Sequence, residues 1–422
     1  MKNFIVVGIT LLLFAACSPK KSLISKTFNE QLSSAFYQNQ FTGILVVDAN
    51  TKDTIYNLDS HKYFIPASNT KIFTLFAALK TLPAQIPALR YIEINDSLYF
   101  EGTGDPSFLH PFLKDSTALK FLQRHDNLVY TTNYFGDEKY GPGWAWDDYQ
   151  WYYSPEKNDL PIHGNVVMTS NNSGLNVSPS YFKDSVFQLT KKKNRKEFSN
   201  TFYYSPLSRD TVETPFITSN TTTKSILEHL LNKKIEQRAT MPFGKKQTLY
   251  SIDSDSLYVR MMHESDNFIA EQLLLLAGSE LKDSLDSKLI RTHILNNELD
   301  DLKQMPRWVD GSGLSRYNLF TPQNMVTVLD KLYRMISTER LFAIFPAGGV
   351  SGTLKNRFSG DDQPYIYAKS GSLSNTYCLS GYLLTKSGKT LIFSFMNNHY
   401  KQATNEERTR MEQMLQTLRD TY

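Results

Sequence analysis

The stretch Ile65-Pro66-Ala67-Ser68-Asn69-Thr70-Lys71-Ile72-Phe73 joins the two patterns that decide the fold of this chain. Before it, residues 42–49 and 54–58 alternate as two strands separated by a polar turn. After it, apolar residues recur at helical spacing as far as Leu82, and a proline ends the run. The stretch is therefore predicted to be the corner between an early β-hairpin and an apolar helix, with Ser68 at the helix start.

The C-terminal part of the chain supplies the other elements of a predicted core. Helical spacing and strand-like alternation recur at residues 257–263, 267–277, 365–368, 378–385, 390–396 and 404–422. Thr404 and Glu407 fit a capping box at the start of the last helix. We predict an α+β fold in which residues 23–83 and 241–422 form one antiparallel sheet flanked by helices.

Residues 84–240 have a different character from the predicted core. They contain short strands, frequent Gly and Pro, and an aromatic cluster at residues 144–153. We predict an inserted region of one or two mainly β subdomains, in which the aromatic side chains belong to the core rather than to a binding surface.

Composition argues against several functional classes. Hydrophobic residues make up 41% and charged residues 21%, and 46 basic residues balance 42 acidic ones to a net charge of +4, so nucleic-acid binding is not expected. The eight histidines show no metal-ligand spacing, so a metallopeptidase is not expected. Cys378 lies in an apolar run and is predicted to be a buried structural thiol.

The first segment resembles an export signal. Lys2 precedes an apolar run from Phe4 to Phe14, which is shorter than the roughly 20 residues of a membrane span. Small residues and Cys17 follow, and this ending resembles a bacterial lipobox. The resemblance implies a signal peptide at 1–16, a lipid on the Cys17 sulfur, a polar tether at 17–22, and a location on the periplasmic face of a membrane. A plain signal peptide with an incidental cysteine is the alternative.

Three short motifs that can support acyl transfer occur in a fixed order: Ser68-Asn69-Thr70-Lys71, Ser265-Asp266-Asn267 and Lys369-Ser370-Gly371. A serine at a helix start faces unpaired N–H groups. A lysine three residues later shares its face of the helix and can act as a base when burial removes its proton. The order S-x-x-K, S-D-N and K-T-G is the signature of penicillin-binding proteins and β-lactamases, with serine here in place of threonine.

Each of these motifs is weak by itself. A Ser-x-x-Lys motif begins at Ser18, Ser68, Ser154, Ser180 and Ser279, and a second Lys-Ser-Gly begins at Lys386. Only Ser68 starts an apolar helix directly after a hairpin, whereas Lys386 lies in a polar turn between strands. Ordinary alternatives are helix caps for Ser68 and Ser265 and a solvated strand end for Lys369. All three motifs in the required order are harder to explain in this way.

Further segments extend the likeness beyond the three motifs. From about residue 30 to near the C-terminus, the chain resembles the class C low-molecular-mass penicillin-binding proteins, the D-alanyl-D-alanine carboxypeptidase/endopeptidase family. The matching stretches are residues 102–106 (GTGDP), 270–274 (AEQLL), 310–316 (DGSGLSR), 349–354 (GVSGTL) and 369–381. The long gap between Ser68 and Ser265 suits this family, which carries extra domains there. Ser370 departs from the family's usual threonine but keeps the hydroxyl.

The resemblance implies catalytic roles for four residues. Ser68 would attack the carbonyl carbon between two D-alanines and form an acyl-enzyme, and Lys71 would take its proton. Ser265 would relay a proton to the leaving amine. Asn267 would bond Lys71 and the substrate backbone.

The third motif and the residue after it are implied to bind substrate. Lys369 and Ser370 would hold the terminal carboxylate, and Gly371 would let a substrate backbone approach closely. The backbone N–H groups of Ser68 and Ser372 would form an oxyanion hole. The resemblance implies no metal and no organic cofactor.

We therefore expect a serine β-lactamase/transpeptidase-like core with D-Ala-D-Ala carboxypeptidase activity on peptidoglycan stem peptides. The sequence does not show whether the protein also hydrolyses D,D-cross-links, or which of the two activities is the stronger. β-Lactams are the expected covalent inhibitors, and the lipid anchor is the expected membrane contact. The alternatives are a β-lactamase of the same fold, which would turn penicillin over rapidly, and a catalytically silent wall-binding lipoprotein.

Overall fold

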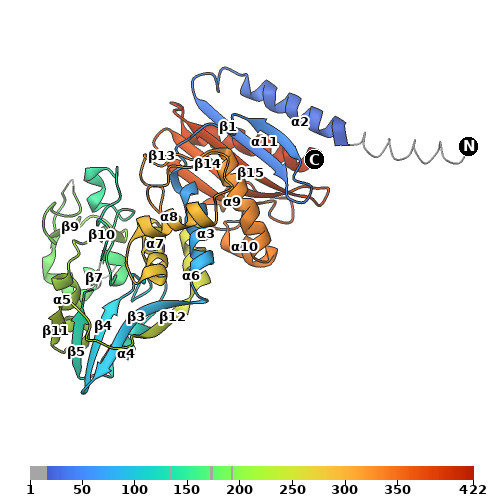
Figure 1. The fold of residues 1–422 in the computed structure, drawn as a ribbon. Coiled ribbons are helices and arrows are strands. Elements are labelled where there is room, and N and C mark those ends of the chain that lie inside the picture. The colour runs from blue at the N-terminus through green and yellow to red at the C-terminus, as the bar shows by residue number, and fades with distance from the viewer. Residues whose placement is uncertain (1–16, 133–134, 172–173, 192) are drawn as a thin grey trace, which may run out of the picture.

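The structure, a computed structural model, describes residues 17–132, 135–171, 174–191 and 193–422. Its core is a five-stranded sheet of order β13-β14-β15-β1-β2, in which every neighbouring pair is antiparallel. The strands are β1 (Phe41–Asp48), β2 (Thr54–Leu58), β13 (Ile366–Leu373), β14 (Thr376–Leu384) and β15 (Thr390–Asn398). The first and last strands of the chain thus share one sheet, as predicted (Figure 1).

Helices cover both faces of this sheet (Figure 1). Ile44 and Val46 of β1 pack against α2 (Cys17–Leu32) and α11 (Thr404–Thr421), whereas Leu45 between them packs into the cluster on the opposite face. This alternation follows from strand geometry and makes β1 apolar on both sides. The helices on the opposite face are α3 (Lys71–Thr81), α6 (Ser254–His263), α7 (Asn267–Lys282), α8 (Ser287–Asn297), α9 (Pro322–Met335) and α10 (Thr338–Ile344).

The chain between α3 and α6 forms an inserted region that lies away from both termini (Figure 1). It contains a sheet of order β11-β5-β4-β3-β12, a sheet of order β10-β6-β7 and the pair β8-β9, around one shared apolar cluster. Its strands are β3 (Gln85–Ile94), β4 (Ser97–Gly102), β5 (Asn127–Thr131), β6 (Val166–Ser170), β7 (Asn176–Ser178), β8 (Val186–Gln188), β9 (Phe202–Tyr204), β10 (Val212–Pro215), β11 (Ile235–Arg238) and β12 (Gln247–Asp253). Its helical elements are α4 (Thr117–Gln123), η2 (Trp146–Gln150), η3 (His163–Asn165), η4 (Ser180–Ser185) and α5 (Asn220–Leu231).

Strand pairing suggests a later end for the inserted region than the sequence pattern did. β12 runs antiparallel to β3, from Gln247 opposite Tyr91 to Asp253 opposite Gln85. Every β12 side chain is exposed or half-buried, which is why its alternation was weak in the sequence. We infer that the insertion covers residues 84–253 rather than 84–240.

Two local predictions differ from the structure. The capping box is wrong: α11 is capped by Ala403, the Thr404 hydroxyl bonds that of Tyr400 at 3.0 Å, and Glu407 accepts from the Asn397 amide at 2.8 Å. The aromatic cluster at 144–153 is core only in part, because Tyr149 is buried whereas the Trp146 side chain is 68% exposed.

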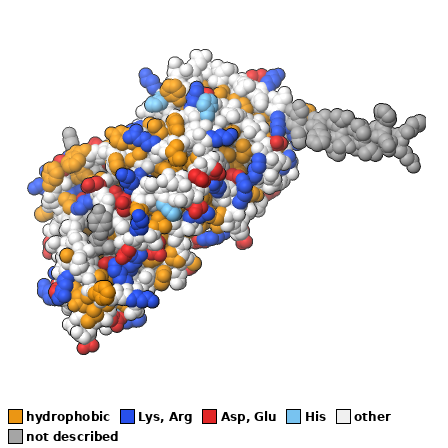
Figure 2. Space-filling view, in the orientation of Figure 1, with side chains coloured by type: hydrophobic (Ala, Val, Ile, Leu, Met, Phe, Trp, Pro, Cys, Tyr) orange, Lys and Arg blue, Asp and Glu red, His pale blue; other side chains and the backbone are white. Residues whose placement is uncertain are grey.

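The N-terminal predictions fall partly outside the described residues. The predicted signal peptide, residues 1–16, lies there entirely. Residues 17–22, predicted to be a tether, form the start of α2, which is held on the sheet by the buried side chains of Ile24 and Phe28. Within the described part of the chain, no helix is long and apolar enough to cross a bilayer. Acidic and basic side chains alternate over the visible surface, as the balanced charge suggests (Figure 2).

Gln272 of α7 fastens the inserted region to the core. Its buried side chain donates from Nε2 to the carbonyls of Gly104 at 2.8 Å and Asn158 at 3.0 Å. Its Oε1 accepts from the Asn158 N–H at 3.2 Å. Gly104 belongs to the stretch 102–106 noted in the sequence, so this stretch has a structural task at the junction.

The substitution Gln272→Ala should therefore destabilise the protein. It leaves buried backbone groups without partners, and each such group costs about 1–3 kcal/mol. Urea unfolding should show a clearly lower midpoint. The control Gln247→Ala removes an exposed glutamine that bonds Tyr91, and it should change stability by less than about 0.5 kcal/mol. Equal midpoints for both variants would contradict the assignment.

Candidate active site

Ser68 lies in a short 3₁₀ turn, η1 (Ala67–Thr70), directly before α3. The predicted position at the start of the helix is confirmed. Ala67 has φ of 48°, a conformation that residues with a Cβ atom rarely adopt. The Asn69 side chain donates to the Lys369 carbonyl at 2.8 Å and ties the turn to β13. Sequence reasoning missed Asn69, because its partner lies far away along the chain.

Lys71 connects the first two motifs. Its fully buried Nζ donates to Ser68 Oγ at 3.1 Å, to Asn267 Oδ1 at 2.7 Å and to the Ser312 carbonyl at 2.7 Å. These contacts use all three hydrogens of the ammonium group. Burial lowers the pKa of Lys71 to about 8, although the negative charges of Asp310 and Glu271 oppose the shift. Lys71 can therefore lose its proton near neutral pH.

The loop at residues 310–315 supplies the third acceptor for Lys71. Asp310 holds the loop by accepting from the N–H groups of Gly313 at 2.8 Å and Ser315 at 2.7 Å. Gly313 has φ of 81°, and a Cβ there would lie 1.9 Å from the Ala67 carbonyl oxygen. Glu271 accepts from the Ser312 N–H at 2.7 Å, and its own pKa is raised by burial and by Asp310. The glycine in this loop is thus required by its close approach to the Ser68 turn.

The second motif forms the corner between α6 and α7. Asp266 is the N-cap of α7 and accepts from the Ile269 N–H at 3.1 Å, so of the two residues in this motif that can cap a helix, Ser265 and Asp266, the second does so. Ser265 itself has φ of 57°. Asn267 donates from Nδ2 to the Tyr153 carbonyl at 2.9 Å, which orients its Oδ1 toward Lys71.

The third motif lies in the edge strand β13. Lys369 is fully buried, not solvated, and its Nζ donates to Ser265 Oγ at 2.9 Å and to the Ser370 carbonyl at 2.7 Å. Burial and the neighbouring Lys71 hold the pKa of Lys369 well below its usual range. The Ser370 hydroxyl donates to that of Thr353 at 2.8 Å. The second Lys-Ser-Gly lies in the β14–β15 turn, as predicted, where Lys386 pairs with Asp420 at 3.3 Å.

Gly371 brings β13 against the Ser68 turn. A Cβ at this position would lie 2.6 Å from the Pro66 carbonyl oxygen and 2.9 Å from the Ser68 nitrogen. The following residue, Ser372, is exposed and lines the same cleft as Ser68. The backbone N–H groups of Ser68 and Ser372 thus belong to two segments that Gly371 holds in close contact.

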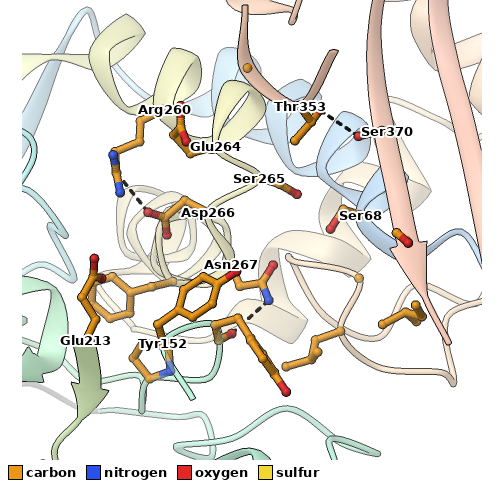
Figure 3. A pocket seen from close by; sticks show the side chains of 18 of the residues that line it. Ser68, Tyr152, Glu213, Arg260, Glu264, Ser265, Asp266, Asn267, Thr353 and Ser370 are labelled. Carbon is orange, nitrogen blue, oxygen red and sulfur yellow. Dashed lines mark hydrogen bonds and ion pairs between the residues drawn. The ribbon is translucent and has the colours of Figure 1, made fainter. Parts of the chain in front are cut away.

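One cleft of about 1240 Å³ lies between the core and the inserted region, and Lys71 and Lys369 are buried behind the serines that line it. Ser68, Ser265, Asn267 and Ser370 face it from the core, while Glu213 and Tyr152 reach it from the insertion (Figure 3). Among the described side chains that line it, no other Ser-x-x-Lys serine is found. Cys378 is fully buried, and burial raises the pKa of its thiol, so the predicted structural thiol is confirmed.

The arrangement suits acyl transfer by a serine hydroxyl. A buried amine with a lowered pKa touches the Ser68 oxygen and can accept its proton. A second buried amine, Lys369, lies next to the Ser265 hydroxyl and in its protonated form can hold an anionic group of a ligand. Within the described ranges, no three His, Cys, Asp or Glu side chains gather as metal ligands.

Comparison with known proteins gives one family match. A family model described as the D-Ala-D-Ala carboxypeptidase 3 (S13) family matches residues 26–420. The D-alanyl-D-alanine carboxypeptidase DacB of Haemophilus influenzae is 23% identical over 90% of this chain and 90% of its own length. A D-alanyl-D-alanine carboxypeptidase of an Actinomadura species is 24% identical over 85% of this chain and 77% of its own.

Solved structures show the same architecture. Penicillin binding protein 4 (dacB) from Haemophilus influenzae has a TM-score of 0.73 and 21% identity, covering 93% of this chain and 98% of that one. A predatory peptidoglycan endopeptidase from Bdellovibrio bacteriovorus has a TM-score of 0.54 and 16% identity, covering 90% and 92%. At these identities the likeness shows the fold alone.

The geometry predicts how the reactivity of Ser68 depends on pH. Lys71 accepts a proton only when it is neutral, so acylation of Ser68 by p-nitrophenyl acetate should speed up with pH and level off above about 8. Glu271→Gln removes a negative charge that favours the ammonium form, so the midpoint should move to lower pH. Stopped-flow measurement across pH 5–10 would show both effects.

A matched control lies on the same helix. Glu280→Gln removes a carboxylate that pairs with Arg90 at 3.0 Å, away from the cleft, and should leave the midpoint in place. An upward shift for Glu271→Gln, or equal shifts for both variants, would contradict the role of Glu271.

Proposed function

The chain belongs to the D-Ala-D-Ala carboxypeptidase 3 (S13) family, and from this premise we propose that Ser68 is the nucleophile of its serine-type D-Ala-D-Ala carboxypeptidase activity. The protein is a penicillin-binding hydrolase of peptidoglycan peptides. One observation carries the assignment of the nucleophile. The buried Lys71 ammonium touches both the Ser68 hydroxyl and the Asn267 amide, so that one group links two motifs far apart in the sequence.

We propose the following course for acylation. Ser68 Oγ attacks the carbonyl carbon between the two D-alanines while Lys71 Nζ, 3.1 Å away, takes its proton. The developing oxyanion accepts hydrogen bonds from the backbone N–H groups of Ser68 and Ser372. The C–N bond then breaks, and the leaving amine receives a proton through the Ser265 hydroxyl. Water afterwards attacks the ester and restores Ser68.

The terminal carboxylate of the substrate has a fitting partner in Lys369. In the free protein, burial lowers the pKa of this lysine. A carboxylate bound beside it favours the charged form and raises its pKa again. Ser370 and Ser372, which line the cleft on the same strand, offer hydroxyl and backbone donors next to that site. Gly371 keeps this strand in contact with the Ser68 turn.

Penicillin should label Ser68 covalently. The peptide spanning residues 63–71 should gain the mass of the drug, and Ser68→Ala should gain none and lose hydrolysis of D-Ala-D-Ala peptides by a factor of 10³ or more, as roughly expected for removal of a nucleophile. Peptide mass spectrometry locates the adduct. An adduct on Ser154, Ser180 or Ser279 would overturn the assignment. Rapid release of hydrolysed penicillin would favour a β-lactamase.

We further propose that the protein is an exported lipoprotein that acts on the periplasmic side of a membrane. The support is the sequence of the first segment, in which Cys17 follows an apolar run and two alanines. The helix α2 begins at this cysteine and packs along the sheet at an end of the molecule remote from the inserted region (Figure 1). An anchor at Cys17 would therefore leave the insertion side of the cleft turned away from the membrane.

Cys17→Ala tests the anchor. The substituted protein should be found in the soluble fraction or keep its first segment, because no sulfur remains to carry the lipid. Fractionation and mass spectrometry of the N-terminus measure both. Ser18→Ala, which leaves the cysteine in place, should stay membrane-bound. A Cys17→Ala protein that is processed normally and remains on the membrane would refute the proposal.

A further inference from the structure

The cleft extends past the Ser68 site to a rim of three cations. Lys355 and Arg357 follow η5 (Gly352–Leu354), Arg408 projects from the first turns of α11, and all three line the cleft. We call Lys355, Arg357 and Arg408 the basic rim. The inserted region contributes Asp148 and Glu213 to the lining of the cleft, and the core also contributes Arg260 and Asp266, which pair with each other at 3.1 Å. The basic rim is therefore a local group of cations on the core side of the cleft.

Arg408 is the least satisfied member of the basic rim. Its guanidinium stacks on the Tyr377 ring, 4.9 Å from the ring centre. Its Nε is buried and has no hydrogen-bond partner among the described residues. Arg357, by contrast, is held by Glu412 at 3.4 Å and by Thr409 at 3.2 Å. A partly dry, stacked guanidinium that faces a cleft is a ready site for an anion.

The basic rim adjoins the part of the site that is proposed to hold the leaving group. The Ser370 hydroxyl, next to Lys369, bonds Thr353, and Thr353 is two residues from Lys355 on the same loop. Tyr377, on whose ring Arg408 stacks, lies directly opposite Ser372 in the pairing of β13 with β14. A leaving group whose carboxylate is bound by Lys369 and Ser370 can therefore continue toward the basic rim.

We propose that Arg408, supported by Lys355, binds a further carboxylate of the leaving group and so selects leaving groups that are themselves acidic peptides. This inference rests on the proposed function. D-alanine, released from a terminal D-Ala-D-Ala, has a single carboxylate, which Lys369 and Ser370 already hold. The second peptide of a D,D-cross-link carries additional carboxylates farther from the scissile bond. The planar guanidinium can bind one of them through two parallel hydrogen bonds.

Two synthetic cross-linked peptides test this selection. They share the acyl part and the carboxylate next to the scissile amide, and they differ only in whether the distant carboxylates of the leaving peptide are free or amidated. The wild-type protein should hydrolyse the free form with a kcat/KM at least about tenfold higher, the size expected for a charge-assisted hydrogen bond. The ratio should fall with added salt, because the site is open to solvent on one side.

Variants assign the effect to Arg408. Arg408→Ala should reduce the ratio to about one, and Arg408→Lys should restore part of it because it keeps the charge. The matched control is Arg410→Ala. Arg410 lies on the same helix and stacks on the Phe36 ring, 4.0 Å from its centre. Its substitution therefore removes a similar stacking contact but leaves the lining of the cleft unchanged. Arg410→Ala should keep the wild-type ratio.

The outcomes separate this inference from the proposed function. If the wild-type protein hydrolyses a D-Ala-D-Ala peptide but shows no preference for free carboxylates, or if Arg408→Ala keeps the preference, the acidic subsite is refuted. If Arg408→Ala and Arg410→Ala reduce the ratio equally, the effect comes from helix α11 and the subsite is likewise refuted. If the wild-type protein cleaves none of these peptides, the proposed function itself fails.

Discussion

The burial of the Lys71 ammonium is the constraint on which the rest of the site depends. A lysine removed from water is stable only when every N–H group finds an acceptor, and its three acceptors come from three separate segments. The Ser68 turn, the α6–α7 corner and the 310–315 loop must therefore meet at one point. Gly313 permits that meeting, since any side chain there would collide with Ala67. The packing that buries Lys71 therefore also brings Ser68 and Asn267 into contact with it.

Residues of the inserted region also support the groups that surround Lys71. Asn267 is oriented by the Tyr153 carbonyl, and Asp310 accepts from the Trp144 indole at 2.9 Å, so two residues of the insertion support the partners of Lys71 from outside the core. Gln272 of α7 also connects the core to the inserted region, through the carbonyls of Gly104 and Asn158. The aromatic segment 144–153 thus serves the site through backbone and indole contacts. This accounts for a segment with buried and exposed aromatic residues side by side.

Much of the core could be predicted because its signals are local. The alternation of residues 42–49, the apolar helix after Ser68 and the late strands all reflect burial, which each segment shows in its own composition. The hydrogen-bond partners of Lys71 could be predicted only in part: the motifs identified Ser68 and Asn267, but nothing local in the sequence indicates that the Ser312 carbonyl contacts Lys71. We infer a later end of the insertion than the sequence pattern indicated, because β12 is held by backbone pairing with β3 and its exposed or half-buried side chains give little periodicity.

The two buried lysines also limit the charge that the site holds. Lys71 lowers the pKa of Lys369, because like charges in a dry site repel. Under the proposed assignment, a substrate carboxylate beside Lys369 stabilises the charged form of that lysine. The resulting ion pair is nearly neutral as a whole, so it adds little net charge beside Lys71. The lowered pKa of Lys71 comes first from its own burial, and this amine can therefore lose its proton near neutral pH whether or not a substrate carboxylate is bound.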